Sequence, residues 1–279
     1  MSRVSLNRVN AFSFFTMIIE FLVISTASAE LLLSAPPREK PDVGESYYAP
    51  IAKRLSEVLG EPVVYRHPET WHNYARSMRE GKYDIVFDGP HFAAWRMNNV
   101  NHTPVARLPG ELGFVIMAKS DNKKVNSVND LVAKKICGLA SPNLGTMVVF
   151  AIFDNPVIQP EIVIVSGGMK AVMKKFLNGE CEYAVVRDTI FNALPDKTKK
   201  DIKIIVHSKP LPNQTITVSK KLDAGKRDKI SNFILSNDGA LSASNLLNRF
   251  SKKKKYFVRA EVSEYTNLEG LLQGVVYGW

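Results

Sequence analysis

Short apolar runs alternate with amphipathic segments along most of the chain. The runs ELLLSA (30–35) and YDIVF (83–87) have the length and aliphatic content of buried strands. Between them, the segment 45–60 (ESYYAPIAKRLSEVLG) places apolar residues at helical spacing, and Gly60 ends it. A strand, PVVYRH, and a second helix, ETWHNYARSMREG, follow before YDIVF. This order predicts parallel strands joined by crossover helices.

The same alternation begins a second time near residue 120. Strands are expected in KKICGLA, EIVIVS, CEYAVV and DIKIIVHS, with helices between them. Extended segments at 113–120 and 213–220 flank this second unit, and the helical C-terminal segments are expected to return to the first. The sequence therefore predicts an α/β fold of two lobes, each a mainly parallel sheet flanked by helices, joined by two hinge strands.

The expected boundaries follow from this pattern. Lobe I comprises 30–118 and 212–279, and lobe II comprises 119–211. Ligands of open α/β sheets bind beyond the carboxyl ends of the strands, so a cleft between the lobes would collect those ends from both sides. Such a cleft is typical of solute receptors that close by a hinge motion.

The first 29 residues have the layout of a secretory signal peptide. Arg3 and Arg8 precede an apolar stretch at 11–24, and Ala27 and Ala29 form an A-x-A cleavage signal. An uncleaved membrane anchor is the alternative. After residue 30 no apolar run is long enough to span a bilayer, so the mature chain is expected to be soluble and to lie outside the cytoplasm.

Composition narrows the class of protein. The 279 residues are 45% hydrophobic and 23% charged, which suits one large or two medium domains. The net charge is 37 − 27 = +10, and the lysine run 252–255 lies in the most basic region. This region is either an anionic-surface patch or a solvated basic face, and the second is favoured because no nucleic-acid motif accompanies it. No nucleic-acid partner is expected.

The two cysteines leave two readings open. Cys137 and Cys181 both occupy strand positions, and an oxidising compartment would permit a disulfide between them. Two buried free thiols are the alternative. Two lone cysteines without a nearby histidine do not indicate a metal site. There is also no G-x-S-x-G, H-E-x-x-H, P-loop or G-x-G-x-x-G motif, so no catalytic residue, metal or cofactor is expected and the chain is not expected to be an enzyme.

The stretch ASPNLGT, 140–146, lies between an apolar strand and the helix that begins TMVVFAIF. It is either an ordinary strand-to-helix turn or an anion cradle. In the cradle, backbone N–H groups and hydroxyls at the helix start face a small charged ligand.

Four stretches resemble one family, and in matching order. They are YYAPIAKRLSEVLGEPVVYRH, GKYDIVFDGPHFAAWRM, ASPNLGT and SGGMKAVMKKFLNGECEYAVV. Together they resemble the phosphonate-binding family of periplasmic ABC-transporter receptors, which have the type 2 periplasmic binding-protein fold. The resemblance covers nearly the whole mature chain and implies capture of a small phosphonate- or phosphate-like anion in the cleft.

The resemblance also implies ligand-binding positions. An aromatic residue at the start of the first helix contacts the ligand in the family, and Tyr47 or Tyr48 holds that position here. A Ser/Thr-rich turn at a helix N-terminus holds the oxygens and matches the stretch 140–146. Within this stretch the expected ligand-binding residues are Ser141, Asn143, Gly145 and Thr146.

The chain departs from the family at two positions. Asp88 stands where an aromatic residue commonly precedes the Gly-Pro, and Met169 stands where the family's phosphonate binders carry a histidine. Asp88 is expected to contact a protonated oxyanion or a ligand amine, or else simply to cap the next helix. Arg187, at a strand end, is expected to replace the missing cationic contact, with a surface arginine as the alternative.

The sequence thus predicts a monomeric periplasmic solute-binding protein for a phosphonate-, phosphite- or phosphate-like oxyanion, with an ABC-transporter permease as partner. A periplasmic sensory module that signals to a membrane receptor is one alternative. A binder of a different small ligand, such as an amine, is another.

Overall fold

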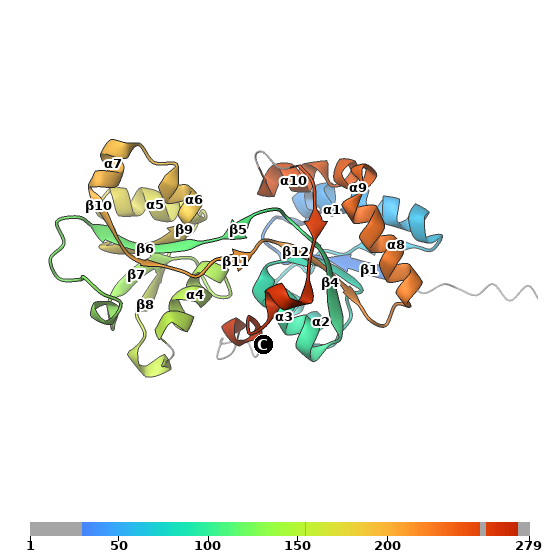
Figure 1. Cartoon of the computed structure of the whole chain (residues 1–279), viewed down its shortest axis with the longest axis horizontal. Coiled ribbons are helices and arrows are strands. Elements are labelled where there is room, and N and C mark those ends of the chain that lie inside the picture. The colour runs from blue at the N-terminus through green and yellow to red at the C-terminus, as the bar shows by residue number, and fades with distance from the viewer. Residues whose placement is uncertain (1–29, 154, 252–254, 273–279) are drawn as a thin grey trace, which may run out of the picture.

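A computed structural model describes residues 30–153, 155–251 and 255–272, which form two α/β lobes along the long axis of the molecule (Figure 1). Within these residues no helix combines the length and hydropathy needed to cross a membrane. The expected signal peptide, most of the lysine run and the end of the expected C-terminal helix lie outside the described residues.

Lobe I is built on a sheet with the strand order β13-β4-β12-β3-β1-β2. Strand β1 is parallel to β2 and β3, whereas β12 is antiparallel to β3 and β4. The sheet is therefore mixed rather than mainly parallel, because β12 returns from lobe II and enters against the direction of its neighbours. The strands are β1 (Leu31–Ser34), β2 (Val63–Tyr65), β3 (Ile85–Asp88), β4 (His102–Arg107), β12 (Thr215–Ser219) and β13 (Val258–Arg259).

The helices of lobe I end where the sequence provides start and stop signals. Helix α1 begins with Pro41 at its first position, four residues before the expected start, and ends at Gly60 with φ 72°. The hydroxyl of Thr70 caps α2 by accepting from the backbone N–H of Asn73. The helices are α1 (Pro41–Leu59), α2 (Trp71–Arg79), α3 (Pro90–Asn99), α8 (Ala224–Leu235), α9 (Asn237–Ser242) and α10 (Ser244–Phe250).

Lobe II has a second mixed sheet with the order β10-β6-β9-β7-β8. Strand β7 is parallel to β8 and β9, and β6 is antiparallel to β9 and β10. Its strands are β6 (Phe114–Lys119), β7 (Lys135–Gly138), β8 (Glu161–Ile164), β9 (Tyr183–Arg187) and β10 (Ile202–His207). Its helices and 3-10 turns are η1 (Asn129–Leu131), α4 (Leu144–Phe153), η2 (Pro156–Ile158), α5 (Met169–Leu177), α6 (Asp188–Asn192) and α7 (Asp196–Lys200).

Two short antiparallel strands, β5 (Glu111–Leu112) and β11 (Leu211–Pro212), join the lobes (Figure 1). The segment expected to cross at 113–120 instead lies within lobe II as β6, paired along its length with β9 and β10. The first crossing therefore falls at β5, several residues before the expected boundary at 118/119. The other segment expected to cross, 213–220, likewise lies within one lobe, as β12 of lobe I, and the second crossing falls at β11.

The C-terminal segment contacts both lobes rather than lobe I alone. It forms two 3-10 turns, η3 (Val262–Tyr265) and η4 (Glu269–Leu272), instead of a continuous helix, and Asn267 between them has φ 66°. Leu272 is fully buried in a cluster that contains Phe92 of α3 and Met147 of α4. The segment thus links the lobes at a place separate from the β5–β11 crossing.

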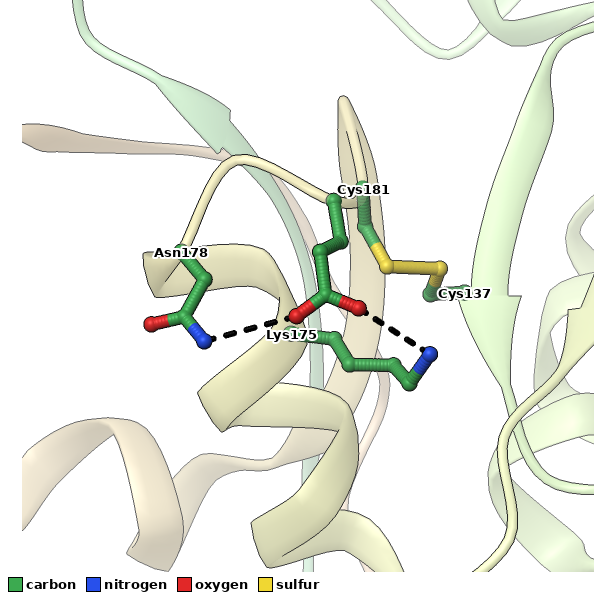
Figure 2. The surroundings of a disulfide bond; sticks show 5 residues. Cys137, Lys175, Asn178 and Cys181 are labelled. Carbon is green, nitrogen blue, oxygen red and sulfur yellow. Dashed lines mark hydrogen bonds and ion pairs between the residues drawn. A yellow bond between two sulfur atoms is a disulfide. The ribbon is translucent and has the colours of Figure 1, made fainter.

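Cys137 and Cys181 form a disulfide, which settles the alternative left open by the sequence. Figure 2 shows the bond between Cys137 in β7 and Cys181 just before β9, with Lys175 and Asn178 of the preceding helical segment nearby. Both cysteines belong to the same buried cluster as Phe176 of α5. The disulfide therefore ties the end of the α5 segment to strand β7 of the lobe II sheet.

Candidate functional site

A cleft of 510 Å³ lies between the lobes and receives side chains from both. Lobe I contributes Arg38, Trp71, His91, Phe92, Gln214, Arg249 and Phe250. Lobe II contributes Phe114, Leu139, Pro142, Asn143, Leu144, Gly167, Gly168, Met169, Lys170, Arg187 and Ile190, and Leu112 lies at the crossing. None of the described residues that line the cleft is Asp or Glu, whereas four are Arg or Lys.

Helices α3, α4 and α5 begin at the cleft, as do α2 and α6, whose first turns contribute Trp71 and Ile190. Residues in the first turns of α3, α4 and α5 line it, and the N–H groups of a first helical turn have no partner within their own helix. Gly167 and Gly168, with φ 95° and 81°, form the turn that brings α5 to this place. Helix N-termini favour negative charge, so the backbone and the cationic side chains act in the same direction.

On the lobe I side, two arginines lie against one aromatic ring. The guanidinium carbon of Arg38 is 5.7 Å from the ring centroid of Phe250, and that of Arg249 is 5.1 Å away. Such contacts hold a guanidinium by its face and leave its edge nitrogens available. Arg249 also pairs with Glu39, at 3.2 Å.

On the lobe II side, the cleft is lined by Arg187, which the sequence analysis named as an expected ligand contact. Its guanidinium carbon is 6.0 Å from the ring centroid of Phe114, and its Nε is 3.8 Å from Asp188. Burial lowers the pKa of Arg187, and Asp188 opposes that effect, so the guanidinium keeps its charge.

The stretch 140–146 has two roles, because it caps the start of α4 and also contributes residues to the cleft lining. Asn143 lines the cleft, and its Oδ1 accepts from the backbone N–H of Gly145 at 3.0 Å. A side chain at Gly145 would lie 2.9 Å from Met169, so glycine permits the close approach of α4 and α5. The hydroxyl of Thr146 is buried and donates to the carbonyl of Leu139 at 2.5 Å, so it does not face the cleft.

Ser141 immediately precedes the cleft-lining Pro142. Its Oγ is buried and has no hydrogen-bond partner among the described residues. Of the four positions expected within this stretch to bind the ligand, Asn143 lines the cleft, Ser141 and Gly145 lie beside it, and Thr146 supports the turn from behind.

Neither tyrosine at the start of α1 lines the cleft. Tyr48 is buried in the core of lobe I, where it stacks on Tyr65 with ring centroids 4.9 Å apart. Tyr47 is partly buried and packs against the same core. Because α1 begins at Pro41, both tyrosines lie in its second and third turns, away from its N-terminal end.

Asp88 is also absent from the cleft. It is fully buried and pairs with Arg96 of α3, at 2.6 Å to Nη1 and 2.7 Å to Nη2. The hydroxyl of Tyr74 donates to the same carboxylate. Burial, followed by the charge of Asp88, raises the pKa of Tyr74 well above its ordinary value, so that hydroxyl remains a donor. Asp88 therefore fixes α3 to the sheet and is satisfied without a ligand; nor does its side chain cap α3.

Unsatisfied buried polar atoms gather at the cleft. Within the described part of the chain, Arg38 Nη1, His91 Nδ1, Arg187 Nε and Gln214 Oε1 have no hydrogen-bond partner, and all four residues line the cleft. Buried polar atoms normally find partners, so such a concentration indicates a site that is completed by a ligand or by ordered water.

His91 joins the two lobes directly. Its Nε2 donates to the carbonyl of Pro142 at 3.1 Å, because a carbonyl can only accept, which leaves Nδ1 unprotonated in the neutral ring. Burial lowers the pKa of His91 to about 4, although the Pro142 carbonyl and Asp88 oppose this. His102, buried in lobe I between Tyr83 and Thr217, has its pKa lowered by burial and then by Arg96 to about 3.

These histidines predict a loss of stability in mild acid. Both are neutral in the folded protein, whereas in the unfolded chain they take up protons below about pH 6.5. The free energy of unfolding should therefore fall between pH 6.5 and about 4, by up to about 1.4 kcal/mol per pH unit for each histidine. Urea unfolding at pH 7 and pH 5 measures the fall, and His102→Gln should make it shallower; an identical slope in that variant would contradict this assignment.

Sequence reasoning missed several residues of the cleft. Arg38 follows β1 and Lys170 follows β8, so both lie beyond the carboxyl end of a strand, the same signal that marked Arg187. Arg249 and Phe250 come from α10, and only the tertiary fold brings them to the cleft. No group of three side chains capable of holding a metal ion occurs in the described residues.

One family model matches most of the chain. The model for "ABC transporter, phosphonate, periplasmic substrate-binding protein" matches residues 33–265. A search of curated proteins finds no match.

Solved structures with the same fold include two bound to anions. XAC2383 from Xanthomonas citri bound to ATP has a TM-score of 0.65 at 15% identity, over 88% of this chain and 96% of that one. PhnD1 from Prochlorococcus marinus in complex with methylphosphonate has a TM-score of 0.61 at 17% identity, over 87% and 97%. A binding protein component of an ABC phosphonate transporter from Pseudomonas aeruginosa has a TM-score of 0.56 at 16% identity, over 87% of this chain and 85% of that one.

The two lobes and the cleft between them have the type 2 periplasmic binding-protein fold, as the sequence predicted. The chain belongs to the phosphonate family of periplasmic ABC-transporter substrate-binding proteins.

Proposed function

We propose that this protein captures a small phosphonate-, phosphite- or phosphate-like oxyanion in the interlobe cleft and presents it to the permease of an ABC transporter. The observation that carries the proposal is the charge of the cleft. Arg38, Lys170, Arg187 and Arg249 line it, and no carboxylate does so among the described residues. A cationic site with several helix N-termini favours an oxyanion over a neutral or cationic solute.

The residues proposed to hold the oxyanion belong to lobe II. They are Arg187, Asn143, Lys170 and the backbone N–H groups at the starts of α4 and α5. The buried Oγ of Ser141 is a further donor if its rotamer turns toward the cleft. The methylphosphonate complex of PhnD1 supports the choice of a phosphorus oxyanion.

The alternative of an amine ligand depended on Asp88 as the carboxylate partner of a ligand ammonium. Asp88 is instead buried and paired with Arg96, so this alternative has lost its main support. Neither a sensory role nor catalysis has a specific observation in its favour among the described residues. Since the family comprises transporter components, we propose a binding role without turnover.

We place the protein in the periplasm, as a monomer. The family is periplasmic, and the disulfide fits an oxidising compartment. The N-terminal 29 residues would then act as the signal peptide, with their layout of two arginines, an apolar stretch and an A-x-A site.

Arg187→Gln tests the proposed site. Removing a charged hydrogen-bond donor to an anion costs about 1.5–3 kcal/mol, so the dissociation constant for methylphosphonate should rise about 10- to 150-fold. Isothermal titration calorimetry measures it. Lys197→Gln, which removes a charge from the exposed surface of lobe II, is the matched control and should bind as the unsubstituted protein does. Equal affinities in the two variants would rule out Arg187 as a ligand contact.

A further inference from the structure

The cations of the cleft form two separate groups, one on each lobe. Arg38 and Arg249 lie against Phe250 in lobe I, at 5.7 and 5.1 Å from its ring centroid. Arg187 and Lys170 belong to lobe II, where Arg187 lies near Phe114 and Lys170 is in the first turn of α5. One oxyanion bound at the helix N-termini of lobe II would leave the lobe I group to be satisfied by something else.

Each group retains a positive charge after its own carboxylate is counted. Arg249 pairs with Glu39 at 3.2 Å, and Arg187 lies 3.8 Å from Asp188. Arg38 and Lys170 have no carboxylate partner among the described residues. In addition, Nη1 of Arg38 is buried without a hydrogen bond, a condition that costs free energy until an acceptor arrives. Each lobe therefore presents one uncompensated cation to the cleft.

The walls of the cleft also include apolar surface. Trp71 and Phe92 line it from lobe I, and Leu112, Phe114 and Ile190 line it from the crossing and lobe II. Its volume of 510 Å³ lies in the range of pockets that hold whole organic molecules, which is about 300–1,000 Å³. A phosphonate head group alone would neither contact the apolar walls nor fill this volume.

We propose that the ligand carries two anionic groups joined by a short organic segment: a phosphonate or phosphate for lobe II, and a carboxylate or second phosphoryl group for lobe I. This inference rests on the proposed function and names the ligand class for the same cleft. The phosphoryl end belongs to lobe II because α4 and α5 offer backbone N–H groups there. The planar guanidinium of Arg38 suits a two-oxygen acceptor such as a carboxylate.

A ligand with two anionic groups would also favour the closed arrangement of the lobes. Each charged end binds one lobe, so the ligand bridges them, and its full binding energy is reached only when the lobes approach each other. A single-headed phosphonate would satisfy lobe II and leave Arg38 without an acceptor.

The test compares two phosphonates of equal carbon number by isothermal titration calorimetry. 3-Phosphonopropionate carries a carboxylate at its third carbon, and propylphosphonate does not. The proposal predicts that 3-phosphonopropionate binds at least about tenfold more tightly, the gain expected from one charged hydrogen bond. In Arg38→Gln the affinity for 3-phosphonopropionate should fall at least about tenfold more than that for propylphosphonate. Lys53→Gln, an exposed position on α1 of the same lobe, should leave the ratio unchanged.

The outcomes separate this inference from the proposed function. Equal binding of the two phosphonates, or an equal loss of both in Arg38→Gln, would overturn the two-headed ligand and leave the phosphonate receptor intact. Rejection of both phosphonates with binding of inorganic phosphate or phosphite would likewise overturn only the two-headed ligand. Rejection of both phosphonates, phosphate and phosphite, with or without binding of the dicarboxylate succinate, would overturn the proposed function itself and the ligand class with it.

Discussion

Asp88→Ala should destabilise the protein by about 3–5 kcal/mol, because it leaves the guanidinium of Arg96 charged and unpaired in the core of lobe I. Arg96 is 1% exposed, and both of its Nη atoms donate to Asp88. Its Nε and Nη2 also donate to the hydroxyl of Thr217, at 3.1 and 3.0 Å, but these neutral partners cannot replace the carboxylate. Urea unfolding of the unsubstituted protein and the variant measures the difference.

A paired substitution is the control for this prediction. Asp88→Leu combined with Arg96→Met removes both charges and keeps apolar volume, and replacing a buried ion pair in this way is often neutral or stabilising. The double variant should therefore recover most of the lost stability. A double variant as unstable as Asp88→Ala would show that the site needs the ion pair itself, and a stable Asp88→Ala would contradict the burial of Arg96.

Loss of the disulfide should cost about 4 kcal/mol. Cys137 and Cys181 are 44 residues apart, and the chain-entropy account gives about 4 kcal/mol for closing a loop of that length in the unfolded chain. In a protein of this size such a loss corresponds to a fall in melting temperature of about 8–16 °C.

Scanning calorimetry of Cys137→Ser/Cys181→Ser measures that fall. Dithiothreitol should lower the melting temperature of the unsubstituted protein to a similar value and should not affect the double variant. An unchanged melting temperature after complete reduction, verified by thiol titration, would contradict a stabilising role for the bond.

The fold could be predicted from the sequence because its strands and helices are strongly patterned. The apolar run 85–87 in β3 is bounded by Asp84 and Asp88, and α1 has apolar positions at helical spacing, so local preference and burial agree. The direction of β12 could not be predicted in the same way, since it depends on where the chain re-enters lobe I. The crossing was misplaced because an extended apolar segment looks the same whether it joins two lobes or pairs within one.

The site was only partly predictable. Arg187 and Asn143 reach the cleft because the ends of strands and the starts of helices meet there. Asp88 also lies at a strand end, but its side chain is buried against Arg96, eight residues later on α3. The sequence did contain a sign of this pair, because Arg96 follows the apolar residues Phe92, Ala93 and Ala94 on the same helix. Tyr48 was placed wrongly relative to the cleft because α1 starts earlier than the sequence indicated.

The cations of lobe I could not be assigned to the cleft from the sequence, for a different reason. Arg38 lies in the loop before α1, while Arg249 and Phe250 lie in α10, more than 200 residues away in the chain. No local pattern connects them. The basic character of the C-terminal region was visible in the sequence, but a solvated face and a cleft wall have the same composition.

The most direct test of oxyanion capture is a thermal-shift panel on the protein after an unfolding and refolding step that removes bound ligand. Phosphate, phosphite, methylphosphonate, 3-phosphonopropionate, sulfate, a dicarboxylate and a simple amine are each tested at about 1 mM; a ligand with a dissociation constant of about 1 μM stabilises by roughly 4 kcal/mol at that concentration. For a protein of this size we expect a rise of about 8–16 °C with at least one phosphorus oxyanion and no rise with the amine. A rise with the amine alone, or no rise with any phosphorus oxyanion, would contradict oxyanion capture.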